Sequence, residues 1–170
     1  MKRLRYSVAM SLDGFIAGPN GEYDWIVMDP EFDWKALYDQ FDTVVMGRGT
    51  YDTMRERGMS PKAMGMRVFV VSTSLAPAEH PDVTIISRHV PQAIAAVKAE
   101  AVKDVWLFGG GVLFRTLLDA GLVDGIDVAV EPVLLGSGVP LIPEGHRGEL
   151  RLVECMPRAS GVVMLKYEVA

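Results

Sequence analysis

The chain lacks most of the residues that several classes of protein depend on. Its 170 residues include one cysteine, so no internal disulfide can form, and its three histidines match no metal-ligand spacing. No apolar run approaches the length of a membrane span. Lysine and arginine form no cluster, and the net charge of −5 opposes broad contact with nucleic acid or with acidic membranes. These absences predict a cytoplasmic protein without metal, nucleic acid or membrane partners.

The few reactive side chains are expected to be structural. Cys155 lies in the apolar segment 152–156, so we expect it in the core rather than as a nucleophile. His80, His89 and His146 lie in loop-like segments and are expected at the surface. The basic amino-terminal residues are not followed by a long apolar segment, so no secretion signal is predicted.

Enough apolar residues are present for one core. They make up 49% of the chain, and a domain of this length buries roughly 70% of its unfolded surface. No linker, repeat or low-complexity segment interrupts the chain. Residues 1–170 are therefore predicted to form a single domain.

Three consecutive glycines form the most informative motif. Gly109, Gly110 and Gly111 separate an apolar strand, 105–108, from an amphipathic helix, 112–118. Glycine leaves room for a ligand to touch the backbone, and the helix amino terminus attracts phosphate. The segment does not match G-x-G-x-x-G, because Phe114 stands where the third glycine belongs. A packing turn without a ligand is the alternative.

Two further strand ends carry polar residues. Segment 46–51 places Arg48 and Thr50 at the start of a helix, where Arg48 is either a phosphate ligand or a solvated residue beside a helix cap. Segment 72–74 sets hydroxyls after another apolar strand. Open α/β sheets bind ligands at the carboxyl ends of their strands, so these segments predict one crevice for an elongated, phosphate-bearing ligand.

Alternating strands and helices predict the fold class. Strands are expected at 4–12, 43–47, 67–72, 83–86, 105–108 and 126–135, and helices near 50–56, 91–101 and 112–118. Another helix, capped by Asp33, is expected to present Trp34, Leu37, Tyr38 and Phe41 on one face. Segments 150–156 and 162–169 form an antiparallel hairpin. The predicted architecture is α/β, with three layers (α-β-α) around a mixed, mostly parallel sheet.

Four motifs in order resemble a known family. Segments 11–14, 46–51, 108–111 and 132–141 are similar to those of the dihydrofolate reductase superfamily, and especially of the branch with the reductase domain of bacterial riboflavin biosynthesis. The resemblance extends from Leu4 to Tyr167. It implies a dihydrofolate reductase-like fold and an NADPH-dependent reductase that transfers a hydride to a small heterocyclic (pterin-like or aminopyrimidine-like) or carbonyl substrate. A catalytically silent nucleotide-binding protein of the same fold is the alternative.

The resemblance also implies a set of cofactor-binding residues. Those for the pyrophosphate are Gly109, Gly110, Gly111, Val112 and Leu113. Those around the adenosine ribose phosphate are Gly47, Arg48, Thr50, Ser72 and Thr73. Arg88 would border the adenine, and the backbone of Ala9 and Ile16 would meet the nicotinamide carboxamide. A guanidinium near the ribose favours NADPH over NADH.

Two aspartates are candidate catalytic residues. Asp13 could orient a substrate hydroxyl or relay a proton, or it could be the turn residue of an Asp-Gly pair. In dihydrofolate reductases a carboxylate on the helix after a tryptophan motif binds the pterin. Asp29, Glu31 and Asp33 compete for that place here; Asp33 aligns best, although an N-cap is its simpler role.

The remaining expectations concern the substrate and a partner. Trp25, Leu37, Gly136 and Ser137 are the candidate substrate residues, and segment 136–138 either closes the pocket, binds a substrate phosphate or forms a bulge. Apolar segments 128–130 and 162–165 are expected to leave sheet surface or a sheet edge that a partner covers, and the related branch often dimerises through its sheet. The resemblance therefore implies a homodimer.

Overall fold

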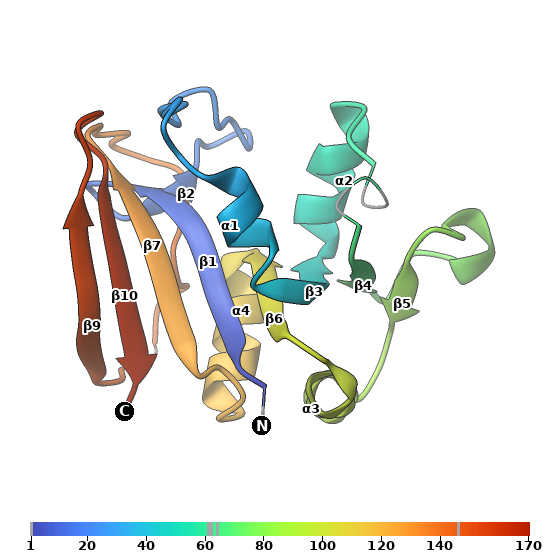
Figure 1. Cartoon of the computed structure of the whole chain (residues 1–170). Coiled ribbons are helices and arrows are strands. Elements are labelled where there is room, and N and C mark those ends of the chain that lie inside the picture. The colour runs from blue at the N-terminus through green and yellow to red at the C-terminus, as the bar shows by residue number, and fades with distance from the viewer. Residues whose placement is uncertain (1, 61–62, 64, 146) are drawn as a thin grey trace.

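A mixed sheet forms the centre of the structure, a computed structural model that describes residues 2–60, 63, 65–145 and 147–170. In the described residues the sheet has eight strands in the order β5-β4-β3-β6-β1-β7-β10-β9 (Figure 1). All neighbours from β5 to β7 are parallel, whereas β10 is antiparallel to both β7 and β9. The strands are β1 (Leu4–Ser11), β3 (Phe41–Gly47), β4 (Arg67–Val71), β5 (Thr84–Ile86), β6 (Asp104–Gly109), β7 (Gly125–Glu131), β9 (Leu150–Pro157) and β10 (Val163–Val169). The predicted mostly parallel sheet and terminal hairpin are confirmed.

Helices cover both faces of this sheet. They are α1 (Trp34–Tyr38), α2 (Arg48–Glu56), α3 (Val90–Glu100) and α4 (Gly111–Asp119), and Pro77–Glu79 adds a 3₁₀ turn. Side chains alternate along β6, because successive residues of a strand point to opposite faces. Leu107 packs in one apolar cluster with α3 and α4, whereas Trp106 packs in the other with α1 and α2. The three-layer architecture is confirmed.

A short ribbon lies beside the large sheet. It pairs β2 (Phe15–Ala17) with β8 (Val139–Pro140) in antiparallel fashion. The amide of Leu12 donates to the carbonyl of Val133 at 2.9 Å, which holds the two connecting segments together. The ribbon thus reaches the ends of β1 and β7 where their parallel pairing stops.

Two predicted boundaries are wrong for physical reasons. Phe41 does not extend the helix of Trp34; it begins β3 and stacks on Trp106 with the ring centroids 5.2 Å apart. Burial and sheet pairing override the helical spacing here. Strand β7 ends at Glu131 rather than continuing to residue 135, because Pro132 has no N–H to donate to a neighbouring strand.

The expectations for cysteine and histidine also need correction. Cys155 is exposed, because β9 is the edge strand of the sheet. His80 is buried rather than at the surface, and its Nδ1 lies 3.0 Å from the Tyr51 hydroxyl, which supplies a partner that its loop-like sequence does not reveal. His89 is exposed as expected, and His146 lies outside the described residues.

The described residues contain neither a membrane-spanning helix nor a metal-ligating group of side chains. No helix among them combines the length and apolar character needed to cross a bilayer. Within the same residues, histidine, cysteine and acidic side chains do not gather in groups of three that could hold a metal ion.

Candidate active site

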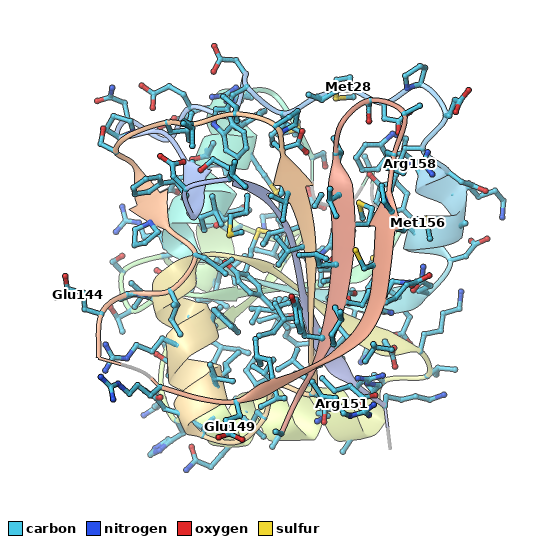
Figure 2. All side chains as sticks on the ribbon, turned by 90° about the vertical axis from the view of Figure 1, so that its left-hand side faces the viewer. Met28, Glu144, Glu149, Arg151, Met156 and Arg158 are labelled. Carbon is cyan, nitrogen blue, oxygen red and sulfur yellow. The ribbon has the colours of Figure 1, made fainter. Side chains whose placement is uncertain are left out.

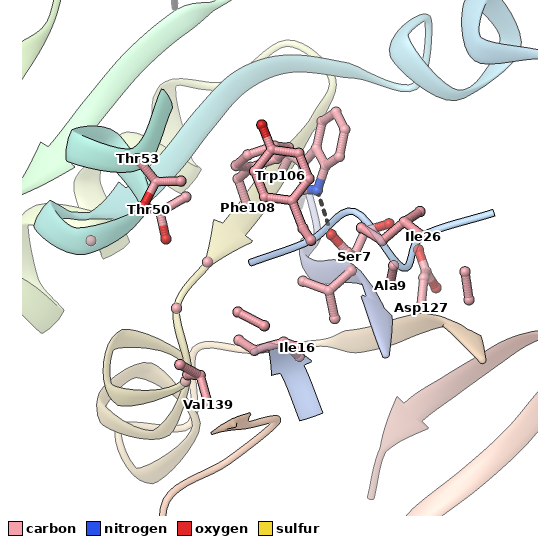
Figure 3. Close-up of a pocket in the computed structure, with 18 of the residues that line it drawn as sticks. Ser7, Ala9, Ile16, Ile26, Thr50, Thr53, Trp106, Phe108, Asp127 and Val139 are labelled. Carbon is pink, nitrogen blue, oxygen red and sulfur yellow. Dashed lines mark hydrogen bonds between the residues drawn. The ribbon is translucent and has the colours of Figure 1, made fainter. Parts of the chain in front are cut away.

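One large cavity runs from the strand ends onto the sheet face. Its volume is about 990 Å³, within the range of small-molecule and cofactor sites. We call its two parts the glycine end (segments 47–50 and 109–113) and the aromatic end (Tyr23, Phe32, Trp34, Tyr38, Trp106 and Phe108, with the sheet residues beneath them). Figure 3 shows Thr50 on one side and Asp127 on the other, with Trp106 and Phe108 between them.

At the glycine end, two strand-to-helix turns face each other. A Cβ atom on Gly109 would lie 2.9 Å from Oγ1 of Thr50, and one on Gly111 would lie 2.9 Å from the carbonyl oxygen of Pro140. Only glycine fits this approach without displacing a neighbour. Helices α2 and α4 both start here without a side-chain cap, so their first N–H groups are open to a ligand.

Arg48 borders the glycine end and is held in place by polar partners. Its Nε donates to Oδ2 of Asp52 at 3.0 Å, and its Nη1 donates to the hydroxyl of Ser74. Ser72 is buried, and its hydroxyl accepts from the amides of Ser74 and Leu75 at 3.2 Å each. Ser72 therefore shapes the turn that presents Ser74 to Arg48.

Most of the predicted cofactor residues line the cavity. These are Ala9, Ile16, Gly47, Arg48, Thr50, Gly109, Gly110, Gly111, Val112 and Leu113. The other three, Ser72, Thr73 and Arg88, lie at the carboxyl ends of β4 and β5 outside the cavity lining. Thr73 and Arg88 are exposed there. The predicted crevice thus forms at the ends of β3 and β6 and continues as an open rim over β4 and β5.

Sheet residues and rings enclose the aromatic end. Small side chains form the floor, where Ser7 and Ala9 of β1 lie beside Asp127 and Ala129 of β7. The indole of Trp106 donates to the carbonyl oxygen of Ser7 at 2.9 Å, drawn as a dashed line in Figure 3. Further rings pack around Trp106, including Tyr38 at 5.8 Å and Phe108 at 5.0 Å between ring centroids. This arrangement is a slot for a flat ligand.

Three carboxylates line the aromatic end. Asp127 accepts from Nε of Arg5 at 2.9 Å, and Asp29 accepts from Nε of Arg158 at the same distance. Among the residues that the structure describes, no cationic side chain pairs with Glu131, whose Oε2 accepts from the amide of Val27 at 3.0 Å. Burial raises the pKa of Glu131 above its ordinary value, because the charged form loses hydration.

The two predicted catalytic aspartates lie outside the cavity lining. Asp13 accepts from the amides of Gly136 at 2.7 Å and Leu135 at 3.1 Å, and from the hydroxyl of Ser11 at 2.6 Å. The Ser11 hydroxyl is the main cause of a lowered pKa of Asp13, with the two amides adding to it. Asp33 caps α1 by accepting from the amide of Ala36 at 2.9 Å.

Only one of the predicted substrate residues reaches the cavity. Leu37 lines it from α1, whereas Trp25 turns its indole to the carbonyl oxygen of Glu22 at 3.0 Å. Gly136 and Ser137 are exposed in the loop after β7, and the amide of Gly136 is engaged by Asp13. Segment 136–138 therefore anchors the ribbon instead of lining the pocket.

Sequence reasoning missed the two acids on β7. Asp127 and Glu131 are four residues apart in a strand, so both side chains point to one face. Two acids at this spacing inside an apolar segment were the available signal. Val162, Met164 and Arg158 of the terminal hairpin also line the cavity, and nothing local in their sequence indicates it.

The fold and the position of the cavity define a class. A mixed sheet with helices on both faces, and a cleft that crosses the carboxyl ends of its parallel strands, are the features of a dihydrofolate reductase-like protein. Residues 2–164 match the family of the RibD C-terminal domain, and the chain belongs to that family.

Known proteins agree with this assignment. YyaP, an uncharacterized protein of Bacillus subtilis (strain 168), is 31% identical over 178 residues, which cover 98% of this chain and 94% of YyaP. The deaminase/5-amino-6-(5-phosphoribosylamino)uracil reductase of Thermotoga maritima superposes with a TM-score of 0.74 at 17% identity, covering 99% of this chain and 57% of that one. Dihydrofolate reductase of Enterococcus faecalis, in complex with NADP(H), gives 0.73 at 20% identity over 98% and 96% of the two chains. At these identities the two structures show the fold alone.

Proposed function

We propose that the protein is an NADPH-dependent reductase that transfers a hydride to a small heterocyclic or carbonyl substrate. The observation that carries this proposal is that a single cavity joins a glycine-lined crevice to an aromatic slot. An elongated dinucleotide and a flat substrate can therefore meet inside it. The reductase names of the Thermotoga and Enterococcus structures support the same class of reaction.

The residues at the glycine end fit such a cofactor. Gly109 and Gly111 leave the space that Cβ atoms would fill, and the uncapped starts of α2 and α4 offer N–H groups to the pyrophosphate. Arg48 and Ser74, with Thr73 and Arg88 at the open rim, would hold the ribose phosphate that distinguishes NADPH from NADH. When bound, NADPH supplies the hydride.

The chain itself would orient the reactants and exclude water. Ala9 and Ala129 form a floor without bulky side chains, so two flat rings can lie across β1 and β7. Trp106 and Phe108 cover this floor from β6. Asp13 is a positioning residue in this proposal, because its lowered pKa keeps it ionised and its oxygens hold the loop after β7.

Titration of the purified protein with NADPH and with NADH, followed by cofactor fluorescence, tests the cofactor. We expect NADPH to bind more tightly. Oxidation of NADPH in the presence of pterins and aminopyrimidines then tests turnover. If neither cofactor binds, the reductase proposal is wrong.

A catalytically silent nucleotide-binding protein is the second candidate. It is favoured by one observation: both predicted catalytic aspartates, Asp13 and Asp33, lie outside the cavity lining. NADPH binding without oxidation across the panel would support this candidate over the enzyme.

We also propose a homodimer that forms through the edge strand β9. Leu152 and Val153 are 51% and 52% exposed, and Met156 lies on the same edge (Figure 2). Apolar side chains on an unpaired edge strand favour pairing with a second chain. Sedimentation of wild type and of Leu152→Glu at micromolar concentration tests it: a wild-type monomer would contradict the dimer, and a dimer lost in the variant would support it.

A further inference from the structure

The charges at the aromatic end are unevenly compensated. Asp127 is paired with Arg5, and Asp29 is paired with Arg158. Glu131 is 2% exposed and receives one hydrogen bond, from the amide of Val27 to Oε2. Among the described residues no donor reaches its other oxygen, Oε1, although the side chain lines the cavity. In the part of the chain that the structure describes, no fully buried side-chain oxygen or nitrogen lacks a partner, so Oε1 is accessible from the cavity, where a ligand can supply a donor.

The position of Glu131 makes it available to a ligand. It ends β7 opposite Ser11 of β1, two residues beyond Ala129 on the same face of the strand. Val27 and Ile26, from the loop above, line the same part of the cavity. A flat ring lying over Ala129 would therefore present its edge to Oε1 of Glu131. Partial burial raises the pKa of this carboxyl.

The aromatic end offers little to a phosphate. In the described part of the chain, Arg158 is the only cationic side chain lining this end, and Asp29 neutralises it at 2.9 Å. The amino terminus of α1 is capped by Asp33, whose carboxylate would repel an anion. A phosphate at this end would face aromatic rings and the carboxylates Asp127 and Glu131, without the donors that anions require.

We infer that Glu131 is the substrate-recognition residue of the pocket, and that the substrate is a phosphate-free, flat heterocycle that donates a hydrogen bond to it from a ring-edge amino or N–H group. This inference rests on the proposed function, because it places the substrate beside the cofactor. It separates this chain from the Thermotoga reductase, whose name specifies a phosphoribosylamino substrate.

The test compares three probes on wild type, Glu131→Gln and Glu149→Gln. The probes are 2,4-diaminopyrimidine, 5-amino-6-(5-phosphoribosylamino)uracil and the same uracil without phosphate, each titrated calorimetrically with and without saturating NADPH. Glutamine keeps an oxygen for the amide of Val27 but removes the charge. Glu149→Gln is the matched control, because it makes the same chemical change at an exposed position outside the cavity lining.

We expect Glu131→Gln to lower the affinity for 2,4-diaminopyrimidine by about tenfold or more, since a hydrogen bond to a charged group is lost. Its NADPH affinity should match that of wild type, and Glu149→Gln should match wild type with every probe. The dephosphorylated form of 5-amino-6-(5-phosphoribosylamino)uracil should bind at least as tightly as the phosphorylated form.

Three outcomes would overturn the inference: an unchanged affinity in Glu131→Gln, a phosphate ester that binds tenfold more tightly, or no probe binding in a wild type that binds NADPH. Failure of the proposed function gives a different pattern. If wild type does not bind NADPH but binds the diaminopyrimidine, and this binding is weakened in Glu131→Gln, the cofactor proposal fails while the inference stands.

Discussion

The two ends of the cavity are built in different ways. The glycine end consists of backbone at two strand-to-helix turns, each made by a few consecutive residues. The aromatic end collects side chains from β1, β6, β7, β10, α1 and the loop before it. The first can change only by disturbing the backbone, whereas the second can change one side chain at a time. A fold built in this way can keep its glycine end while its aromatic end diverges.

The two ends of the cavity also differ in the sign of their charge. Asp52 pairs with Arg48, so the positive charge of the glycine end comes from the two uncapped helix amino termini, whereas Glu131 leaves the aromatic end negative. A ligand with phosphates at one end and a donor-rich ring at the other has one favourable orientation in this field. The predictions below test this contrast.

The largest effect is expected for Gly111→Ala. Its Cβ would lie 2.9 Å from the Pro140 carbonyl oxygen and 3.1 Å from that of Leu141, so the backbone of the ribbon must move. Crowding of this kind lowers the free energy of unfolding by about 1–3 kcal/mol. Because the turn borders the proposed cofactor site, we also expect NADPH affinity to fall about tenfold to a hundredfold. Thermal melting and NADPH titration measure the two effects.

Gly49→Ala is the matched control, because a Cβ there meets nothing within 4 Å and alanine favours the helix. This variant should melt at least as high as wild type. A Gly111→Ala protein that binds NADPH normally would show that the turn does not approach the cofactor closely.

A smaller, cofactor-specific effect is expected for Arg48→Ala. The Arg48 side chain is 53% exposed, so loss of its charged donor should cost only about 1–1.5 kcal/mol of binding free energy, and NADPH should bind about fivefold to tenfold more weakly. NADH, which lacks the ribose phosphate, should be affected little, and titration of both cofactors gives the ratio. Arg55→Ala, exposed on the same helix, is the control. Equal losses for NADPH and NADH would place the ribose phosphate elsewhere.

Arg158→Ala probes the link between the terminal hairpin and the loop over the aromatic end. Figure 2 shows Arg158 and Met28 at the same end of the molecule, and Asp29 joins the two segments. Removing this half-buried partner should cost about 1 kcal/mol and speed amide exchange in segment 26–32. Arg151→Ala breaks an exposed pair with Glu168 and should cost less. Unchanged exchange in Arg158→Ala would mean that the pair does not hold the loop.

The smallest effect is a pH-dependent gain in stability for Glu131→Gln. Burial raises the pKa of Glu131 above 4.5, so the folded protein keeps this proton to a higher pH than the unfolded chain does. Stability from this group therefore falls as pH rises from 4.5 through the folded-state pKa. At pH 7 the variant should melt higher than wild type by about one to a few degrees, with a smaller difference at pH 4.

Exposed Glu144→Gln serves as the control for this effect and should not alter the pH dependence. A difference between Glu131→Gln and wild type that grows toward low pH would contradict the assigned direction of the pKa.

The contrast between the ends explains what sequence could predict. Gly109–Gly111 and Arg48 lie in short contiguous motifs, so the sheet, its crossovers and the glycine end could be predicted. Glu131 and Arg158 enter the cavity only through strand pairing across the chain, which no local pattern specifies. Asp13 and Asp33 were predicted as catalytic from their positions in the motifs of the resembled family. In the structure, backbone N–H groups bind both carboxylates, those at Asp13 coming from residues far along the chain.

The position of β10 has a consequence for the order in which the site is made. The glycine end uses β3, α2, β6 and α4, all of which precede residue 120. The aromatic end also needs Val162 and Met164, and β10 inserts between β7 and β9 only after both neighbours have been synthesised. A growing chain, which emerges from its amino terminus, therefore contains every segment of the glycine end before the segments of the aromatic end are complete.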